Sequence, residues 1–153
     1  MAAAVQCLLC QVDESYLALP ISHVIEVSRP LQLTRVADAP EWIAGVSVMR
    51  GSVTPVIDAR RLLGAPAASG DARASRWVAL RVDQRRVALA VDAVLRAGAL
   101  PEADRPEFAP LVASSALFSS LGTLDAKLLL VLSKARLLAQ DAVQALEAYA
   151  GGR

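Results

Sequence analysis

Two cysteines three positions apart are the first residues of this chain that could carry out chemistry. Cys7 and Cys10 form a C-x-x-C motif within VQCLLCQV. A zinc site would need a second cysteine pair or histidines, and His23 is the single histidine of the sequence. A redox pair would lie at the start of a helix, whereas this stretch looks like a strand, in which positions three apart point to opposite faces. We therefore expect no metal site, two small buried or half-buried cysteines, and a surface or edge position for His23.

An arginine–glycine pair inside a hydrophobic stretch is the second candidate. Residues 45–64 read GVSVMRGSVTPVIDARRLLG, and Arg50 and Gly51 interrupt the apolar pattern. Glycine adopts positive φ without steric cost, and arginine can bind a carboxylate through two parallel hydrogen bonds. The pair predicts a tight turn that presents a guanidinium group. From the residues alone, that group could bind a carboxylate of a partner or a carbonyl of its own loop.

The acidic residues suggest no catalytic site. Asp83 and Asp92 have no carboxylate or base paired with them around which a reaction could be built. Asp58 precedes a short helical pattern and is expected to be a helix N-cap. The sequence therefore predicts a protein that is not an enzyme, with no catalytic residues, no cofactor and no small-molecule substrate.

Composition limits the remaining possibilities. The chain has 153 residues, 55% hydrophobic and 20% charged, which suits one domain or two small subdomains that share a core. A net charge of +1 and an aromatic content of 4% argue against binding to nucleic acid or to an anionic membrane. No apolar run approaches the roughly 20 residues of a membrane span, and the N-terminus lacks a basic region. We expect a soluble intracellular protein without direct membrane contact.

The elements that must position these residues are mainly strands. Apolar residues alternate or form short runs, which is typical of strands, at 4–12, 15–21, 24–28, 44–49, 52–57, 76–82, 86–91, 93–97 and 127–132. Asp83 to Arg85 predicts a hairpin. Capping residues predict short helices over 38–45, from Asp38 and Glu41 to Gly45, and over 58–64. Helical spacing predicts a C-terminal helix over 133–149, and residues 66–75 have the composition of a linker.

The two halves of the sequence resemble each other. Residues 17–26 align on 87–96 with an offset of 70, and residues 52–63 align on 127–138 with an offset of 75. Two matches in the same order favour a duplicated β unit. Each half is small, so we expect the two to share a core.

The order of these motifs matches a known family. Tyr16 to Ile21, Val24 to Glu26, Pro40 to Ile43, Gly45 to Gly51 and Val53 to Arg60 follow one another, and RRVALAVDAVLR and KLLLVLSKARLL follow in the second half. Over about residues 5–149 this pattern resembles the CheW family of chemotaxis coupling proteins. Val48 and Ser133 differ from the asparagine and aspartate that relatives often have there.

The resemblance implies a mainly β fold with two interlocked five-stranded β-barrel subdomains that share a hydrophobic core, plus short helices and a C-terminal helix. A single domain would span residues 1–153. Subdomain one would cover about 15–64. Subdomain two would cover about 76–132, with the N-terminal strand as a candidate to complete it.

The resemblance also implies a cytoplasmic adaptor, recruited to membrane receptor arrays, that links chemoreceptor cytoplasmic tips to the regulatory domain of a CheA-type histidine kinase. Relatives use a groove between the subdomains for the receptor, and subdomain faces for the kinase. Arg50 would couple the receptor or organise that surface, with Glu26 as its structural partner or as a second contact, and Gly45 would let a receptor helix approach closely. The candidate receptor-binding residues are Val24, Glu26, Ile43, Gly45, Val46, Arg50 and Gly51, whereas no residue is assigned to the kinase.

Two other functions are weighed beside this one. An auxiliary CheW-like scaffold could act in a pathway that controls pili, surface sensing or cyclic-dinucleotide output. A small β-barrel protein could instead bind nucleic acid, although the neutral charge and the few aromatic residues argue against it.

Overall fold

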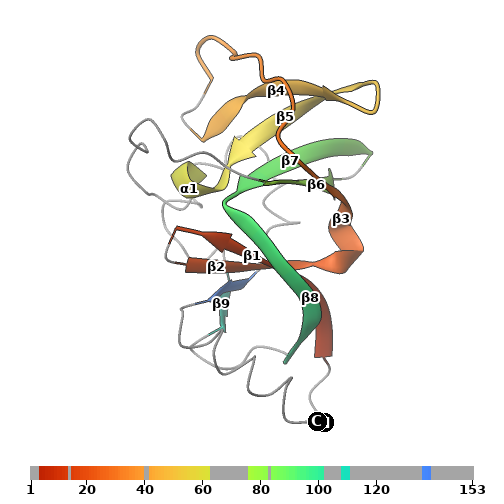
Figure 1. The fold of residues 1–153 in the computed structure, drawn as a ribbon, viewed down its shortest axis with the longest axis vertical. Coiled ribbons are helices and arrows are strands. Elements are labelled where there is room, and N and C mark those ends of the chain that lie inside the picture. The colour runs from red at the N-terminus through yellow and green to blue at the C-terminus, as the bar shows by residue number, and fades with distance from the viewer. Residues whose placement is uncertain are drawn as a thin grey trace.

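Two five-stranded sheets make up the computed structural model of the chain (Figure 1). It describes residues 4–13, 15–39, 42–62, 76–82, 84–101, 108–110 and 136–138. The first sheet has the order β8-β1-β2-β10-β9, with β1 (Ala4–Val12), β2 (Ser15–Pro20), β8 (Ala93–Pro101), β9 (Phe108–Pro110) and β10 (Arg136–Leu138). The second sheet has the order β3-β6-β7-β5-β4, with β3 (Val24–Ser28), β4 (Ile43–Met49), β5 (Ser52–Asp58), β6 (Arg76–Val82) and β7 (Arg85–Val91).

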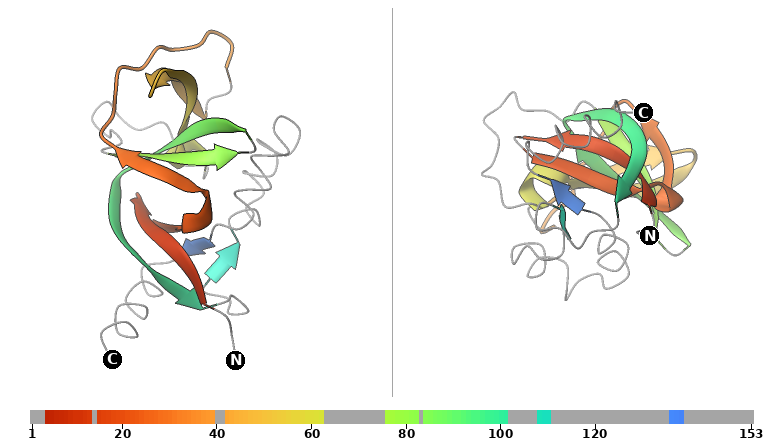
Figure 2. Two further views of the ribbon diagram at one scale, coloured as in Figure 1. Left: turned by 90° about the vertical axis from the view of Figure 1, so that its right-hand side faces the viewer. Right: turned by 90° about the horizontal axis from the view of Figure 1, so that it is seen from below.

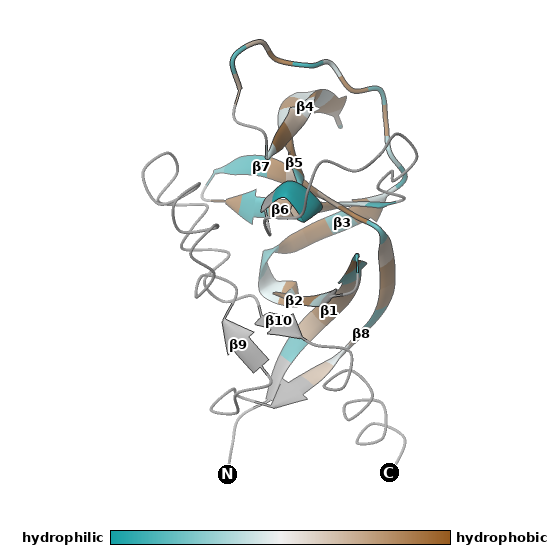
Figure 3. Cartoon of the chain, turned by 90° about the vertical axis from the view of Figure 1, so that its left-hand side faces the viewer, coloured by the Kyte–Doolittle hydropathy of each residue, from teal (hydrophilic) through white to brown (hydrophobic). Residues whose placement is uncertain are grey.

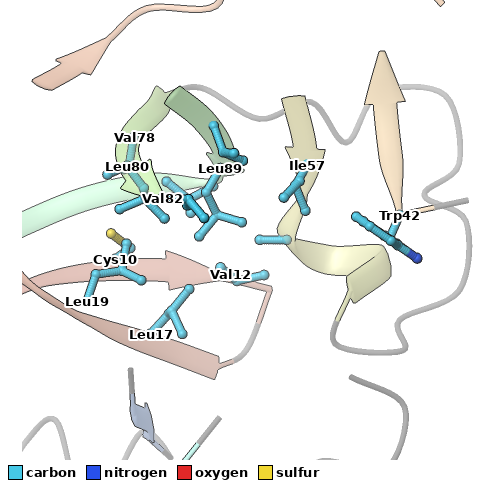
Figure 4. Close-up of a cluster of buried hydrophobic side chains, with 13 residues drawn as sticks. Cys10, Val12, Leu17, Leu19, Trp42, Ile57, Val78, Leu80, Val82 and Leu89 are labelled. Atoms are coloured by element: carbon cyan, nitrogen blue, oxygen red, sulfur yellow. The ribbon is translucent and has the colours of Figure 1, made fainter. Parts of the chain in front are cut away.

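The main core lies between the two sheets. Cys10, Leu17 and Leu19 of the first sheet pack there with Val78, Leu80 and Leu89 of the second sheet (Figure 4). A second cluster covers the opposite face of β6 and β7 and includes Trp77, Ala79 and Ala88. Because both faces of these two strands are covered, their sequences RWVALRV and RRVALAV are almost continuously apolar after the first residues.

The chain passes between the two sheets at two described points. A single turn of 3-10 helix, η1 (Ile21–His23), leads from β2 in the first sheet to β3 in the second sheet. Asp92 alone separates β7 in the second sheet from β8 in the first sheet, and its backbone N–H donates to the carbonyl of Gln11 at 2.9 Å. Figure 2 shows β3 and β8 extending away from the strands that precede them.

Most predicted strands are confirmed within a residue or two, although β8 extends four residues beyond its predicted end. The hairpin at Asp83 to Arg85 is also confirmed, because Val82 and Arg85 are register partners. Strands β9 and β10 were not predicted. The strand predicted at 127–132 and the linker at 66–75 lie outside the described residues.

The helix predicted over 38–45 is wrong. Asp38 has a φ of 62°, whereas an N-cap residue has an extended backbone, and Ile43–Met49 forms β4. Aspartate tolerates the left-handed conformation, and pairing of β4 along β5 outweighs the local capping signals.

The two other predicted helices have different outcomes. Helix α1 (Ala59–Leu62) is confirmed with Asp58 as its N-cap, because Asp58 Oδ1 accepts a hydrogen bond from the Arg60 backbone at 3.0 Å. The C-terminal helix predicted over 133–149 is wrong at Arg136–Leu138, which forms β10 between β2 and β9, where strand pairing satisfies its backbone groups. The rest of that segment lies outside the described residues.

Sheet membership does not follow the two halves of the sequence. Strand β2 belongs to the first sheet, while β3 pairs with β6 and β5 pairs with β7 across the segment expected to be a linker, and β4 joins the second sheet through β5. Each sheet therefore combines the first two strands of one half with the last three strands of the other half.

Both cysteines are buried, as predicted, and Cys10 lies in the core between the sheets, where burial raises the pKa of its thiol to about 12. His23 is half-buried at the end of η1. Within the described ranges, no cluster of three or more His, Cys, Asp and Glu residues is arranged to hold a metal ion. The same ranges contain no helix with the length and apolar character needed to cross a bilayer.

Candidate functional site around Arg50 and Glu26

The Arg50–Gly51 turn has an unusual backbone for an arginine. Met49 and Ser52 are register partners, so Arg50 and Gly51 form a two-residue hairpin loop between β4 and β5. Their φ angles of 53° and 79° are both positive, which defines a type I′ turn. Asparagine or glycine usually occupies the first position of this turn, because other side chains are strained at positive φ. The turn therefore holds an arginine where local backbone preference would select against one.

Glu26 holds the exposed guanidinium of Arg50. Arg50 Nε donates to Glu26 Oε2 at 2.9 Å, and Arg50 Nη2 donates to Glu26 Oε1 at 3.4 Å. The contact is bidentate and joins the hairpin turn to β3. The Arg50 side chain is 72% exposed and that of Glu26 is 24% exposed. The guanidinium of Arg50 thus binds a carboxylate and not a carbonyl of its own loop. This carboxylate belongs to the same chain and not to a partner protein.

A second arginine shares the same carboxylate. Arg86 Nη1 donates to Glu26 Oε2 at 3.1 Å, so one carboxylate oxygen accepts from two guanidinium groups. The pKa of Glu26 is lowered, and the hydrogen bond from Arg50 is the largest cause. Burial opposes this shift, whereas the charge of Arg50 and the contact with Arg86 add to it. The same Arg50–Glu26 hydrogen bond raises the pKa of Arg50. The ionised carboxylate of Glu26 therefore connects β3, on which it lies, with β7 and with the turn between β4 and β5.

The pairing of the second sheet brings these three residues together. Glu26 lies opposite Ala79 on β6, after a register shift between Val24 and Glu26. Arg86 lies near the start of β7, opposite Arg81 of β6. Strand β6 lies between β3 and β7 in the sheet. Strand β5 runs parallel to β7, so the turn that begins β5 lies at the same end of the sheet as the start of β7. The cluster therefore marks one end of the second sheet.

Gly45 lies against its own chain. It is buried, and a Cβ atom there would overlap the Thr34 carbonyl oxygen and press on the Leu33 side chain. Thr34 and Val46 exchange two backbone hydrogen bonds of 2.8 Å, which fix the segment before β4 along that strand. The close approach that requires a glycine here is therefore made by residues 33–34.

The remaining predicted site residues divide between the core and the hairpin. Val24 and Ile43 are half-buried and pack against the core between the sheets. Val46 is half-buried and lies opposite Pro55 in the β4–β5 hairpin. The structure thus brings Glu26, Arg50 and Gly51 together but distributes the other four candidates over β3 and β4.

Two residues of this surface, Arg86 and the exposed Val53, were not predicted from the sequence. Arg86 follows the predicted hairpin turn directly, and that polar end of an otherwise apolar strand was the available signal. Val48, which stands where relatives often have asparagine, is 64% exposed. Its cross-strand partner Val53 was not named as a site residue and is 70% exposed.

A separate ionic cluster lies where the two sheets meet. Arg60 Nη2 contacts Asp13 Oδ1 at 2.9 Å and Asp92 Oδ2 at 3.3 Å. These residues come from α1, from the turn after β1 and from the connection between β7 and β8. A single guanidinium bridges both carboxylates, so the cluster connects elements of the two sheets.

Comparison with known proteins places this geometry in a family. The family model described as the CheW-like domain matches residues 6–142. The chain belongs to the CheW-like domain family. It is 32% identical to the chemotaxis protein CheW of Klebsiella aerogenes over 132 residues, which cover 84% of this chain and 78% of that protein. It is 29% identical to the chemotaxis protein CheW of Helicobacter pylori over 92 residues, which cover 60% of this chain and 54% of that protein.

A solved CheW structure supports the same assignment. The scaffolding protein TtCheW from Thermoanaerobacter tengcongensis matches with a TM-score of 0.57 and 27% identity, over 71% of each chain. A mainly β architecture with two sheets and few helices is therefore common to this CheW-like chain and its structural relative.

Proposed function

We propose that this chain is a non-enzymatic chemotaxis adaptor that couples chemoreceptor cytoplasmic tips to the regulatory domain of a CheA-type histidine kinase. Membership of the CheW-like family supports this function, as do relatives named as chemotaxis and scaffolding proteins. The structural observation that carries the proposal is Arg50, whose exposed guanidinium is preset by Glu26 at the tip of a strained turn. An adaptor needs rigid surfaces of this kind rather than a catalytic pocket.

The proposed receptor-binding surface keeps the seven residues identified from the sequence. Glu26, Arg50 and Gly51 supply its polar part, at one end of the second sheet. The apolar members are Val24, Ile43, Gly45 and Val46. A receptor tip is a helical hairpin, and we propose that its apolar stripe docks beside the Arg50 turn.

The finer architecture and location belong to the same proposal. The two sheets would close as interlocked five-stranded barrels within a single CheW-like domain, completed by a C-terminal helix that begins after β10. The protein would be cytoplasmic and recruited to receptor arrays at the membrane. The exchange of strands between the halves of the sequence supports the interlocked arrangement.

Binding experiments with Arg50 variants test this function. We expect the wild-type chain to bind a receptor tip fragment and the kinase regulatory domain in pull-down and titration experiments. Arg50→Glu should weaken receptor binding by about tenfold, as expected for loss of a charge-assisted contact. Arg50→Asn fits the type I′ turn and removes the charge, so it should also lose affinity while the melting temperature stays the same or rises. Arg35→Glu, at an exposed arginine outside this cluster, is the matched control.

Three outcomes would contradict the proposal or its assignment of Arg50. Binding of the wild-type chain to neither partner would exclude the adaptor function. Unfolding of Arg50→Ala would show that the arginine serves the fold, and retention of full affinity by both Arg50→Glu and Arg50→Asn would exclude it from the receptor surface.

A further inference from the structure

A groove of about 530 Å³ lies at the same end of the second sheet as the Arg50 turn. Strands β3, β5, β6 and β7 form it, so it differs from a groove between the two sheets. Its lining combines three arginines, Arg81, Arg85 and Arg86, with three apolar residues, Ile25, Val53 and Pro55. Figure 3 shows the polar ends of β6 and β7 in teal, next to strands that are mostly brown.

The described lining of this groove is positively charged. It contains three arginines and no acidic residue. Glu26 neutralises Arg86 in part through Nη1, which leaves other N–H groups of that guanidinium available. Arg81 is exposed, and it forms no ion pair with any residue that the structure describes. The groove therefore attracts anions, and its arginines suit planar carboxylates.

The apolar part of the lining narrows the class of partner. Val53 is 70% exposed, and Pro55 lies two residues further along β5 on the same face of the strand. An occupant with aliphatic groups would bury these side chains, which a phosphate or a sugar–phosphate backbone would leave in water. No described lining residue is aromatic, so single-stranded nucleic acid would find no stacking platform. A peptide that carries both carboxylates and aliphatic side chains fits both halves of the lining.

We propose that this groove docks an acidic segment of a partner protein in which glutamate or aspartate side chains are interspersed with aliphatic ones. The carboxylates bind Arg81 and the free N–H groups of Arg86, while an aliphatic side chain packs on Val53 and Pro55. This site goes beyond the proposed adaptor function, because none of its lining residues belongs to the proposed receptor-binding set. Either proposal can therefore fail without the other.

Fluorescence anisotropy with a labelled eight-residue peptide of alternating glutamate and leucine tests this site. We expect it to bind at low salt and to weaken as salt is raised, because charge pairs carry part of the affinity. Arg81→Gln should reduce the affinity by roughly five- to tenfold. Arg96→Gln, at an exposed arginine of β8 in the first sheet, should leave it unchanged. Val53→Thr should reduce it, whereas Val48→Thr, at the exposed cross-strand neighbour outside the lining, should not.

Three results would overturn the proposal. The first is equal loss of affinity in Arg81→Gln and Arg96→Gln, which indicates general charge attraction. The second is tighter binding of a twelve-nucleotide oligothymidylate, or of a control peptide in which lysine replaces each glutamate. The third is absence of binding at low salt. Thermal melts of each variant establish that it is folded, and amide shifts confined to residues 51–55 and 81–86 would place the peptide in the groove.

Discussion

Glu26 organises the candidate surface at the scale of single residues. One of its carboxylate oxygens accepts hydrogen bonds from Arg50 and Arg86, which lie 36 positions apart in the sequence, 50 and 86. Arg50 also occupies the first position of a type I′ turn, where its backbone is less favourable than that of asparagine. The side chain, and not the backbone preference, accounts for an arginine at this position.

The charge of Glu26 gives this cluster a defined pH dependence. Its pKa lies below the ordinary value of 4.5, chiefly because of the Arg50 hydrogen bond. A carboxylate whose pKa is lowered on folding stabilises the folded state above the unfolded pKa, and this stabilisation is lost as pH falls through the folded pKa. We therefore expect Glu26→Gln to be less stable than wild type at pH 7, by a small amount because water screens the exposed guanidinium of Arg50. The two proteins should converge in stability below pH 4.5.

Urea denaturation of wild type and Glu26→Gln from pH 7 to pH 3 measures this effect. A difference between the two proteins that stays constant over the whole range would show that Glu26 acts through packing rather than through its charge. Arg29→Gln, at an exposed arginine beyond the end of β3, controls for a general change in net charge.

Part of this surface was predictable from the sequence. Arg50 and Gly51 interrupt an apolar strand pattern, and that interruption located the turn correctly. Glu26 was considered either as the structural partner of Arg50 or as a second contact, and in the structure it is bound to Arg50. The contact of Arg86 with Glu26 was not predictable, because it depends on the strand order β3-β6-β7, which no local pattern contains.

At the scale of elements, the segment before β4 depends on a glycine. Thr34 lies so close to Gly45 that a Cβ atom would overlap its carbonyl oxygen. We expect Gly45→Ala to lower the free energy of unfolding by about 1–3 kcal/mol, as for other overpacked sites. Gly98→Ala, on β8 with open space around it, should change it by less than roughly 0.5 kcal/mol. Chemical denaturation of both variants measures the difference.

Equal effects of the two substitutions would contradict this account of Gly45. Receptor binding by Gly45→Ala offers a further readout. If the glycine serves only the contact with residues 33–34, the affinity that remains should follow the folded fraction of the variant.

Strand patterns were more reliable than capping patterns in this chain. Alternating and continuous apolar runs located β1 to β8 because burial on one or two faces fixes those residues directly. Residues 38–45 had the composition of a capped helix, yet Asp38 is left-handed and β4 begins at Ile43. Pairing with β5 supplies hydrogen bonds along the whole of β4, and a short helix in water would not match them.

At the scale of the whole molecule, the two sheets have the same strand order. Adding five to the numbers of β3, β4 and β5 and subtracting five from those of β6 and β7 converts the order β3-β6-β7-β5-β4 into the order β8-β1-β2-β10-β9. The segments 17–26 and 87–96, which the sequence aligned, are the two places where the chain changes sheet. One difference remains, since β5 runs parallel to β7 whereas β10 runs antiparallel to β2. The alignment therefore located the two matching changes of sheet, but it did not reveal the exchange of strands between the halves.

That exchange makes the two halves of the chain complementing fragments. Residues 1–68 contain β1 to β5, so β1 would lack β8, β2 would lack β10, β3 would lack β6 and β5 would lack β7. We expect neither this fragment nor residues 69–153 to be soluble alone, because each would expose half of the core between the sheets. Co-expressed, they should purify as a tight one-to-one heterodimer whose melting temperature depends on concentration. Recovery of either fragment as a folded monomer would contradict this expectation. If it holds, the covalent link between the halves only keeps together two pieces that already depend on each other to fold.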